Sequence, residues 1–282
     1  MSSESSYFSN ETNGTIASRI TNQTLKLAKR YLPTDDPKTI SALSDYSLVI
    51  TGTISAGKST ICESLVYILH QLFPELEIVP FPEFLFTGNS ELSEKMLKEK
   101  INGNVSSNTF QSYIIDSWKK IMSENGNKKG FRIFERCVDD CVICFCNIEN
   151  KAKKLSDSQF MALYEELKDI DKSYDIPTYF EIADNQNESH FTKIYSTDLN
   201  YNLTNILSII GCDISNDIKN RIIGLSIEPK TSRERIVKRS REGESGYTDE
   251  QLQMYSTHYE KLFDFIDKGK KISRFVDLGM LL

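Results

Sequence analysis

The sequence lacks any long hydrophobic run, and no stretch of it is dominated by basic residues. Because a helix needs roughly 20 apolar residues to cross a bilayer, we expect no membrane-spanning segment. The N-terminal stretch MSSESSYFSN holds no basic region followed by an apolar one, so we expect no secretory signal and a cytoplasmic location. A formal net charge of −6 without an arginine-rich run argues against a nucleic-acid partner.

Histidine is scarce, and none of the 3 histidines lies near the cluster of four cysteines at residues 137–146. Cys137, Cys141 and Cys144 fall at the i, i+4 and i+7 positions of one helical face, with Cys146 following. Thiolates from one continuous helix cannot close a tetrahedron, which disfavours a zinc site. We expect buried, reduced thiols that pack as small apolar side chains.

The chain of 282 residues is long enough to bury a large core, and its 39% hydrophobic content is ordinary. Residues 1–14 are polar and predict disorder. From Ile16 to Leu32 the apolar residues recur at helical spacing until Pro33, which predicts a helix that packs on the domain. We therefore expect an N-terminal extension, residues 1–45, before a domain at residues 46–282.

Five short apolar runs predict strands, at residues 46–52, 77–84, 131–136, 221–229 and 271–278. Helical patterns separate them, including one from Lys58 to about Phe73. This alternation is typical of an α/β fold with a five-stranded parallel sheet and helices on both faces.

The first predicted strand runs into the loop Gly52-Thr53-Ile54-Ser55-Ala56-Gly57-Lys58-Ser59, which fits G-x-x-x-x-G-K-[ST]. Glycines let the backbone curl so that N–H groups point at phosphate oxygens, and the following helix adds its positive end. We expect a solvent-facing Lys58 to reach the β- and γ-phosphates, and the Ser59 hydroxyl to bind Mg²⁺. The segment through Thr60, called the phosphate loop below, therefore predicts a nucleoside-triphosphate site, whether the nucleotide is hydrolysed, transferred or used as a switch.

Charged residues also stand at the ends of the next two predicted strands, where ligands of such sheets bind. Glu83 ends the second strand and Glu135-Arg136 the third. A glutamate there can act as a general base or bind magnesium, and an arginine can hold a phosphate or orient a carboxylate. Each is more often a solvated charge when alone, but their place after a phosphate loop favours function.

A basic segment, EPKTSRERIVKRSREGES, follows the fourth predicted strand. Its arginines on a helical stretch are typical of a kinase lid, which closes over the triphosphate and excludes water. The alternative is a solvated basic helix.

These motifs together resemble the deoxynucleoside kinases, the thymidine, deoxycytidine and deoxyguanosine kinases of animals and some large viruses. The resemblance rests on the phosphate loop, PEF, FQSY, ER followed by a Cys/Val helix, and the RERIVKRSREGES lid, over about Tyr46 to Leu278. It implies a P-loop kinase fold with an arginine-rich lid, ATP and Mg²⁺ as cofactors, and a homodimer. Residues 175–220 match no part of the family and are treated as an insertion.

The resemblance also implies residue roles. Glu83 matches the catalytic base for the 5′-hydroxyl, Arg136 the arginine that holds it, and Glu135 the acidic magnesium partner. The nucleoside is expected to contact Gln111 through its base edge, Phe145 by stacking and Glu244 through its 3′-hydroxyl. In the lid, the phosphate-binding arginines are Arg235, Arg239 and Arg241. Lys100 stands where the family has a sugar-contacting tyrosine.

The same resemblance predicts the base. Purine- and deoxycytidine-type members carry an aspartate and an arginine at the positions of Cys141 and Trp118, where thymidine-type members have small or apolar residues. We therefore expect a pyrimidine deoxynucleoside kinase, with thymidine or deoxyuridine first and Trp118 near the pyrimidine C5. The alternatives are a nucleoside-monophosphate kinase such as thymidylate kinase, or a non-catalytic nucleotide-binding protein of the same fold.

Overall fold

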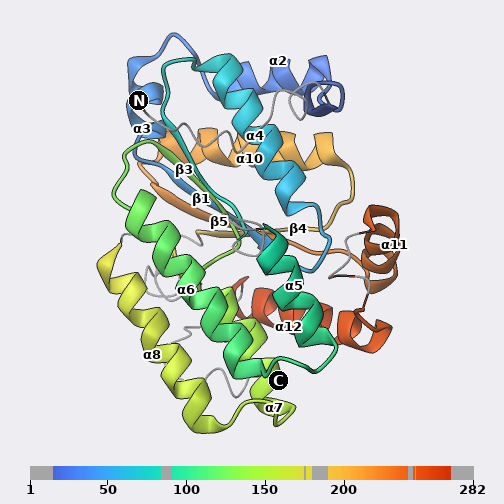
Figure 1. The fold of residues 1–282 in the computed structure, drawn as a ribbon. Helices are drawn as coiled ribbons and strands as arrows, with labels where there is room; N and C mark the ends of the chain where they lie inside the picture. The colour runs from blue at the N-terminus through green and yellow to red at the C-terminus, as the bar shows by residue number, and fades with distance from the viewer. Residues whose placement is uncertain are drawn as a thin grey trace.

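A computed structural model describes residues 15–83, 90–174, 176–179, 190–240, 244 and 246–267. Within these residues, five parallel strands form one sheet in the order β2-β3-β1-β5-β4 (Figure 1). The strands are β1 (Ser47–Gly52), β2 (Ile78–Phe81), β3 (Phe131–Glu135), β4 (Phe191–Ile194) and β5 (Asn220–Leu225). The predicted α/β fold with a five-stranded parallel sheet is confirmed.

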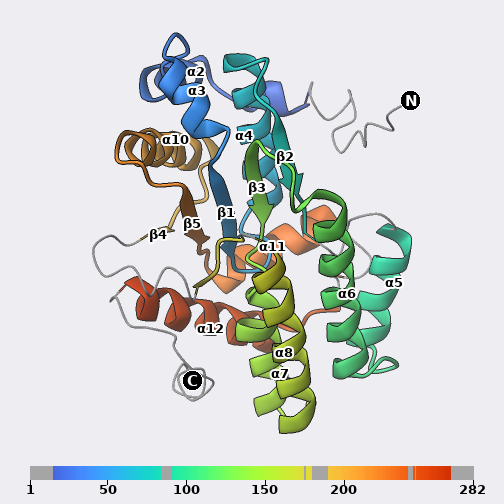
Figure 2. The ribbon, with the colours of Figure 1, turned by 90° about the vertical axis from the view of Figure 1, so that its left-hand side faces the viewer.

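Helices cover both faces of the sheet (Figures 1 and 2). One face carries α2 (Asn22–Tyr31), α3 (Pro37–Leu43), α4 (Lys58–Leu72) and α10 (Leu199–Ser215). The other carries α5 (Ser90–Ile101), α6 (Ser107–Asn125), the π-helical turn η2 (Cys141–Cys146), α7 (Asn147–Lys151), α8 (Asp157–Ser173) and α12 (Asp249–Asp267). The predicted lid forms α11 (Pro229–Arg239) beside the carboxyl ends of the strands.

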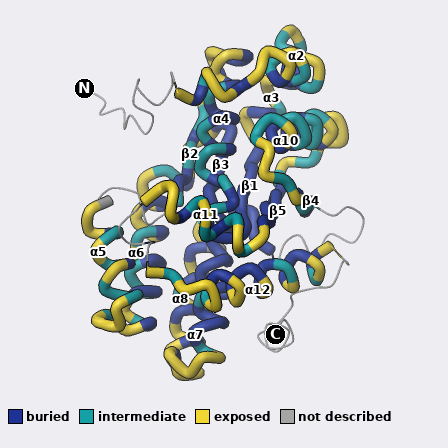
Figure 3. The backbone as a smooth tube through the Cα atoms, turned by 90° about the vertical axis from the view of Figure 1, so that its right-hand side faces the viewer, coloured by how far each residue is buried: buried dark blue, intermediate teal, exposed yellow. Residues whose placement is uncertain are grey.

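The centre of the sheet is buried on both sides, as Figure 3 shows. Successive side chains of a strand point to opposite faces. Val49 therefore packs with α6, α8 and α12, while Leu48 and Ile50 pack with α2, α4 and α10. This double burial explains why β1 reads as a continuous apolar run.

The N-terminal extension packs on the domain, as expected, but its helix is broken. The backbone leaves the helix at residues 18–21, and the Thr21 side chain accepts a hydrogen bond from the Thr24 amide at 3.1 Å, which caps α2. Ile16 and Leu32 lie in the same buried core as α4 and α10. The predicted continuous helix over 16–32 is therefore wrong at its middle, and residues 1–14 lie outside the described residues.

The segment treated as an insertion supplies a strand of the sheet. Within residues 175–220, β4 takes the sheet edge beside β5, and α10 packs against α2 and α4. Asp198 caps α10 by accepting from the Tyr201 amide at 2.7 Å. The strand predicted at 271–278 lies outside the described residues. The sequence Phe191–Ile194 gave little signal because it is four residues long and half polar.

Five of the six cysteines are buried free thiols, as expected, while Cys212 is exposed. Burial raises the pKa of the Cys144 and Cys146 thiols well above the ordinary value, which keeps them neutral. Within the described part of the chain, no group of three or more His, Cys, Asp or Glu side chains is placed to hold a metal ion. No helix of that part has the length and apolarity to cross a membrane.

Candidate active site

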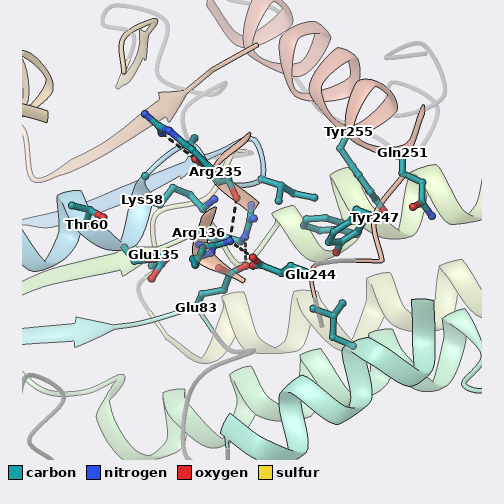
Figure 4. Close-up of a pocket in the computed structure, with 18 of the residues that line it drawn as sticks. Lys58, Thr60, Glu83, Glu135, Arg136, Arg235, Glu244, Tyr247, Gln251 and Tyr255 are labelled. Carbon is teal, nitrogen blue, oxygen red and sulfur yellow. Dashed lines mark hydrogen bonds and ion pairs between the residues drawn. The ribbon is translucent and has the colours of Figure 1, made fainter. Parts of the chain in front are cut away.

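A cavity of about 540 Å³ opens at the carboxyl ends of the strands, between the phosphate loop, α5, α6, α11 and α12 (Figure 4). The predicted site residues that line it are Ile54, Ser55, Ala56, Gly57, Lys58, Ser59, Thr60, Glu83, Gln111, Glu135, Arg136, Phe145, Arg235, Arg239 and Glu244. One cavity therefore joins the predicted phosphate site to the predicted nucleoside site.

The phosphate loop depends on its two glycines. Gly52 has φ = 132°, and a Cβ there would lie 1.9 Å from the Leu225 carbonyl oxygen of β5. Gly57 has φ = 95° and stands at the N-cap of α4. Both conformations are strained for any residue with a side chain, so the loop requires glycine at these two positions.

Lys58 is buried, which corrects the expectation that it faces solvent. Its side chain turns back over the loop, and Nζ donates to the carbonyl oxygens of Thr53 at 3.0 Å and Gly52 at 3.5 Å. Burial lowers the pKa of Lys58 to about 8, and the Arg136 charge adds to this, while the carboxylates of Glu83 and Glu135 oppose it. The ammonium is thus held at the cavity wall without a bonded carboxylate among the described residues.

The lowered pKa of Lys58 predicts a pH-dependent affinity for nucleoside triphosphate. Below about pH 8 the ammonium is already formed, so affinity should stay level. Above it, binding must first protonate Lys58, and affinity should fall by about tenfold per pH unit. Calorimetry with a non-hydrolysable ATP analogue from pH 7 to 9.5 measures this. The variant Lys58→Met should bind more weakly and lose the dependence; an identical fall in the variant would contradict the assignment.

Arg136 and Glu83 form an ion pair at the mouth of the phosphate loop, with Nε 2.7 Å from the Glu83 Oε1 (Figure 4). Arg136 Nη1 donates to the Gly52 carbonyl oxygen at 2.9 Å and to the Tyr259 hydroxyl at 2.8 Å. The guanidinium also lies 5.3 Å from the centre of the Phe145 ring. With so many donors engaged, Arg136 holds the Glu83 carboxylate in one place beside the loop.

The backbone at Arg136 is itself unusual, with φ = 82°. Non-glycine residues adopt this conformation only where the surroundings enforce it. Here the Arg136 amide donates to the Ile50 carbonyl oxygen at 2.9 Å, and the next turn is fixed by Asp140, which accepts from the Cys137 amide at 3.1 Å. Buried Asp140 also accepts from the Tyr179 hydroxyl at 2.7 Å. This network aims the Arg136 side chain back across the carboxyl end of β1.

Ser59 and Glu135, the two predicted magnesium ligands, are in direct contact. The Ser59 hydroxyl donates to Glu135 Oε1 at 2.6 Å. Burial raises the pKa of the Glu135 carboxyl, and the neighbouring Glu83 raises it further. Two oxygen ligands at the N-terminus of α4, with carboxylates that repel each other, make a fitting place for a hard divalent cation.

The lid helix α11 is fastened to the phosphate loop. The Ser232 hydroxyl donates to the Ile54 carbonyl oxygen at 2.7 Å, and Arg235 Nη1 donates to the Ser55 carbonyl oxygen at 3.1 Å. Arg239 donates to the Ser55 hydroxyl at 3.1 Å and pairs with Glu244. The structure therefore brings Arg235, Arg239 and Glu244 to the cavity, while Arg241 lies outside the described residues.

The far end of the cavity holds Gln111 and Phe145. Gln111 is 2% exposed, and its Oε1 accepts a weak hydrogen bond from the Cys141 thiol at 3.4 Å. Phe145 packs against Tyr255, with ring centres 5.4 Å apart. Cys141 thus lies behind Gln111 and does not itself line the cavity.

Trp118 does not line the cavity, which corrects its predicted place near the base. It is fully buried in the core that α6 shares with α8 and η2. Seven residues separate it from Gln111 on the same face of α6, or about 10 Å along the helix axis. Because the indole is buried in that core, replacing Trp118 is expected to affect folding before base choice.

Two residues of the site and its surroundings escaped the sequence analysis. Tyr259 anchors Arg136 from α12, and no charge or motif singled it out. Glu149 lines the cavity one turn after Phe145, a spacing that could have indicated it. It pairs with Lys100 at 3.2 Å, and both bond to the Ser107 hydroxyl.

Part of the chain is similar to known proteins. The family model of the deoxynucleoside kinases matches residues 48–186. Among solved structures, the chain is similar to the deoxyadenosine kinase from M. mycoides with bound dATP, with 17% sequence identity and a TM-score of 0.45, over 79% of this chain and 84% of that chain. No curated protein sequence matches this chain significantly. The matched residues include the phosphate loop, Glu83, Gln111 and the Glu135-Arg136 pair, and over residues 48–186 the chain belongs to the deoxynucleoside kinase family.

Proposed function

We propose that this nucleoside kinase transfers the γ-phosphate of ATP to the 5′-hydroxyl of a pyrimidine deoxynucleoside, with magnesium. The Glu83–Arg136 ion pair supports this most directly. It stands at the mouth of the phosphate loop in the same cavity as the Gln111 amide. A 5′-hydroxyl bound between the phosphate loop and Gln111 would lie within reach of Glu83 as the general base and of the γ-phosphate of a bound nucleotide.

The proposed step needs a group that accepts the proton of the 5′-hydroxyl and cations that stabilise the negative charge on the transferring phosphate. Glu83 accepts the proton of the 5′-hydroxyl as the oxygen attacks phosphorus, while Arg136 holds the carboxylate by the 2.7 Å contact. Lys58, Arg235 and Arg239 surround the phosphate loop and stabilise negative charge on the transferring group. The bond between the γ-phosphorus and the oxygen that bridges it to the β-phosphate breaks as the new ester bond forms, and ADP leaves.

Magnesium is proposed at Ser59 and Glu135. The hydroxyl and carboxylate oxygens are ligands that Mg²⁺ prefers, and their contact at 2.6 Å places them together. The ion would neutralise charge on the phosphates. Phosphate oxygens and water complete such a coordination shell, since Mg²⁺ keeps several non-protein ligands.

The orientation of the Gln111 amide supports a thymine or uracil base. The Cys141 thiol donates to Oε1, which leaves Nε2 free to donate to a base carbonyl and a second Oε1 lone pair to accept an N3–H. Thymine and uracil present that carbonyl and N–H pair. Cytosine presents the reverse pattern and requires the amide to flip away from Cys141. The preference is modest because a thiol is a weak donor.

A nucleoside-monophosphate acceptor is less well supported. Such an acceptor needs a cation for its own phosphate; Lys100 in the cavity is paired with Glu149, and Lys154, which also lines this end, is exposed. The alternative of a non-catalytic nucleotide-binding protein does not account for the Glu83–Arg136 ion pair beside the phosphate loop.

The test is kcat/KM for thymidine, deoxyuridine, the three other natural deoxynucleosides and thymidine monophosphate. Thymidine or deoxyuridine is expected to rank first. The variant Gln111→Leu removes both hydrogen bonds at similar volume and should lower kcat/KM for them by about 10²-fold or more, because a site built for such bonds is left unpaired. Gln253→Leu, an exposed residue of α12, is the control. A purine or the monophosphate ranking first would overturn the proposed acceptor.

A further inference from the structure

The N-terminal extension reaches the cavity. Arg19, which precedes α2, lines it together with Thr197, Leu199 and Asn202 of the β4–α10 segment. The two segments are tied by Asn200, whose Nδ2 donates to the Arg19 carbonyl oxygen at 3.1 Å and whose Oδ1 accepts from the Thr21 amide at 3.0 Å. Helices α2 and α10 then pack side by side (Figure 1). The backbone that carries Arg19 is therefore held in place beside the cavity.

The phosphate loop separates this end of the cavity from the end that holds Glu83 and Gln111, where the phosphate acceptor is proposed to bind. Arg235 joins the two regions, since it donates to the Ser55 carbonyl oxygen at 3.1 Å and to the Thr197 carbonyl oxygen at 3.4 Å. A γ-phosphate directed at Glu83 leaves the rest of the donor extending away from the acceptor. The residues at that end of the cavity are Arg19, Thr197, Leu199 and Asn202, and the base of a bound donor would lie among them.

The side chains at this end suit a base with an amino group. Arg19 is exposed and has no ion pair within the described residues, so its guanidinium is free to stack on a flat ring. Asn202 is 3% exposed, and its Nδ2 donates to the Ser196 carbonyl oxygen at 3.1 Å. That bond fixes the amide, and it leaves Oδ1 as a buried acceptor with no partner in the described part of the chain. Such an acceptor costs stability until an N–H reaches it.

We propose that Arg19 and Asn202 form the base subsite for the phosphate donor, with Arg19 stacking on the ring and Asn202 selecting adenine. The adenine amino group donates to Asn202 Oδ1, where guanine presents a carbonyl oxygen. The proposal rests on the proposed function, because it takes ATP to be the donor. It assigns to the N-terminal extension a part in donor recognition.

Calorimetry with magnesium and non-hydrolysable ATP and GTP analogues tests this without any acceptor. Arg19→Ala should weaken binding of the ATP analogue by about tenfold, the scale of one cation–π contact. Inorganic tripolyphosphate, which has no base, should bind wild type and Arg19→Ala equally. Arg30→Ala, an exposed arginine on α2 that does not line the cavity, is the matched control.

Each other result would overturn a stated part of the proposal. An equal loss of tripolyphosphate binding in Arg19→Ala would show a phosphate contact and overturn the base subsite. Unchanged binding of the ATP analogue would remove Arg19 from the site. A GTP analogue bound as tightly as the ATP analogue would overturn the role of Asn202. If wild type binds neither analogue, the proposed function itself fails, which separates that case from a failure of the subsite alone.

Discussion

Glu83→Gln is expected to lower kcat by about 10²–10⁴-fold, the usual contribution of general-base catalysis. The amide keeps the volume of the carboxylate, and its oxygen can still accept the hydrogen bond that Arg136 Nε now donates at 2.7 Å. What it loses is the basicity needed to take the proton of the 5′-hydroxyl. Binding of the ATP analogue and the KM for the nucleoside should therefore change little. Steady-state kinetics and calorimetry measure both quantities.

The control for this variant is Glu75→Gln, which alters an exposed glutamate after α4. It should leave kcat unchanged. A near-wild-type kcat in Glu83→Gln would show that another group takes the proton. A large loss of ATP binding with little change in kcat would instead place Glu83 among the nucleotide contacts.

Lys58→Met is expected to lower kcat/KM by about 10²–10³-fold or more, because removing one preorganised charge from the transferring phosphate has an effect of this size. Lys58→Ala should lower kcat/KM to a similar degree. Lys58 is 4% exposed and is held over the loop carbonyls, so methionine fills its space better than alanine. Lys58 has no ion-pair partner among the described residues, so removing its buried charge also removes a desolvation cost. The melting temperature of Lys58→Met should therefore equal or exceed that of wild type.

Activity and thermal unfolding measured on the same preparations separate the two effects. Lys120→Met, at an exposed position of α6, should change neither quantity. Normal activity in a Lys58→Met protein that melts normally would contradict the role of the phosphate loop. Lost activity together with a lowered melting temperature would contradict the burial argument.

The sequence alone determined those parts of the site that depend on local backbone geometry. The phosphate loop was predictable because a strand, two glycines with positive φ and a helix N-terminus follow one another along the chain. Glu83 and Glu135-Arg136 were predictable because parallel strands bring their carboxyl ends to one edge of a sheet. Their contact at 2.7 Å is a tertiary result of that rule.

Only the tertiary structure decided where long side chains end. Gln111 and Trp118 share one face of α6, yet Gln111 lines the cavity and Trp118 lies in the core that α6 shares with α8 and η2. The motif around Lys58 predicts a lysine that faces solvent, but its flexible side chain turns back onto the carbonyl oxygens of the loop. Neither outcome depends on the local sequence, since both are set by what packs nearby.

The edge of the sheet shows the same limit. The four residues of β4 carry too little pattern to predict a strand, and β5 supplies the pairing that makes one. Through β4 and α10 the N-terminal extension comes to lie beside the phosphate loop, although Arg19 and Asn202 are far apart in the chain. A sequence pattern reports periodicity over a few turns or one strand. Contacts between distant segments form because burying their apolar faces together lowers the free energy of the whole fold.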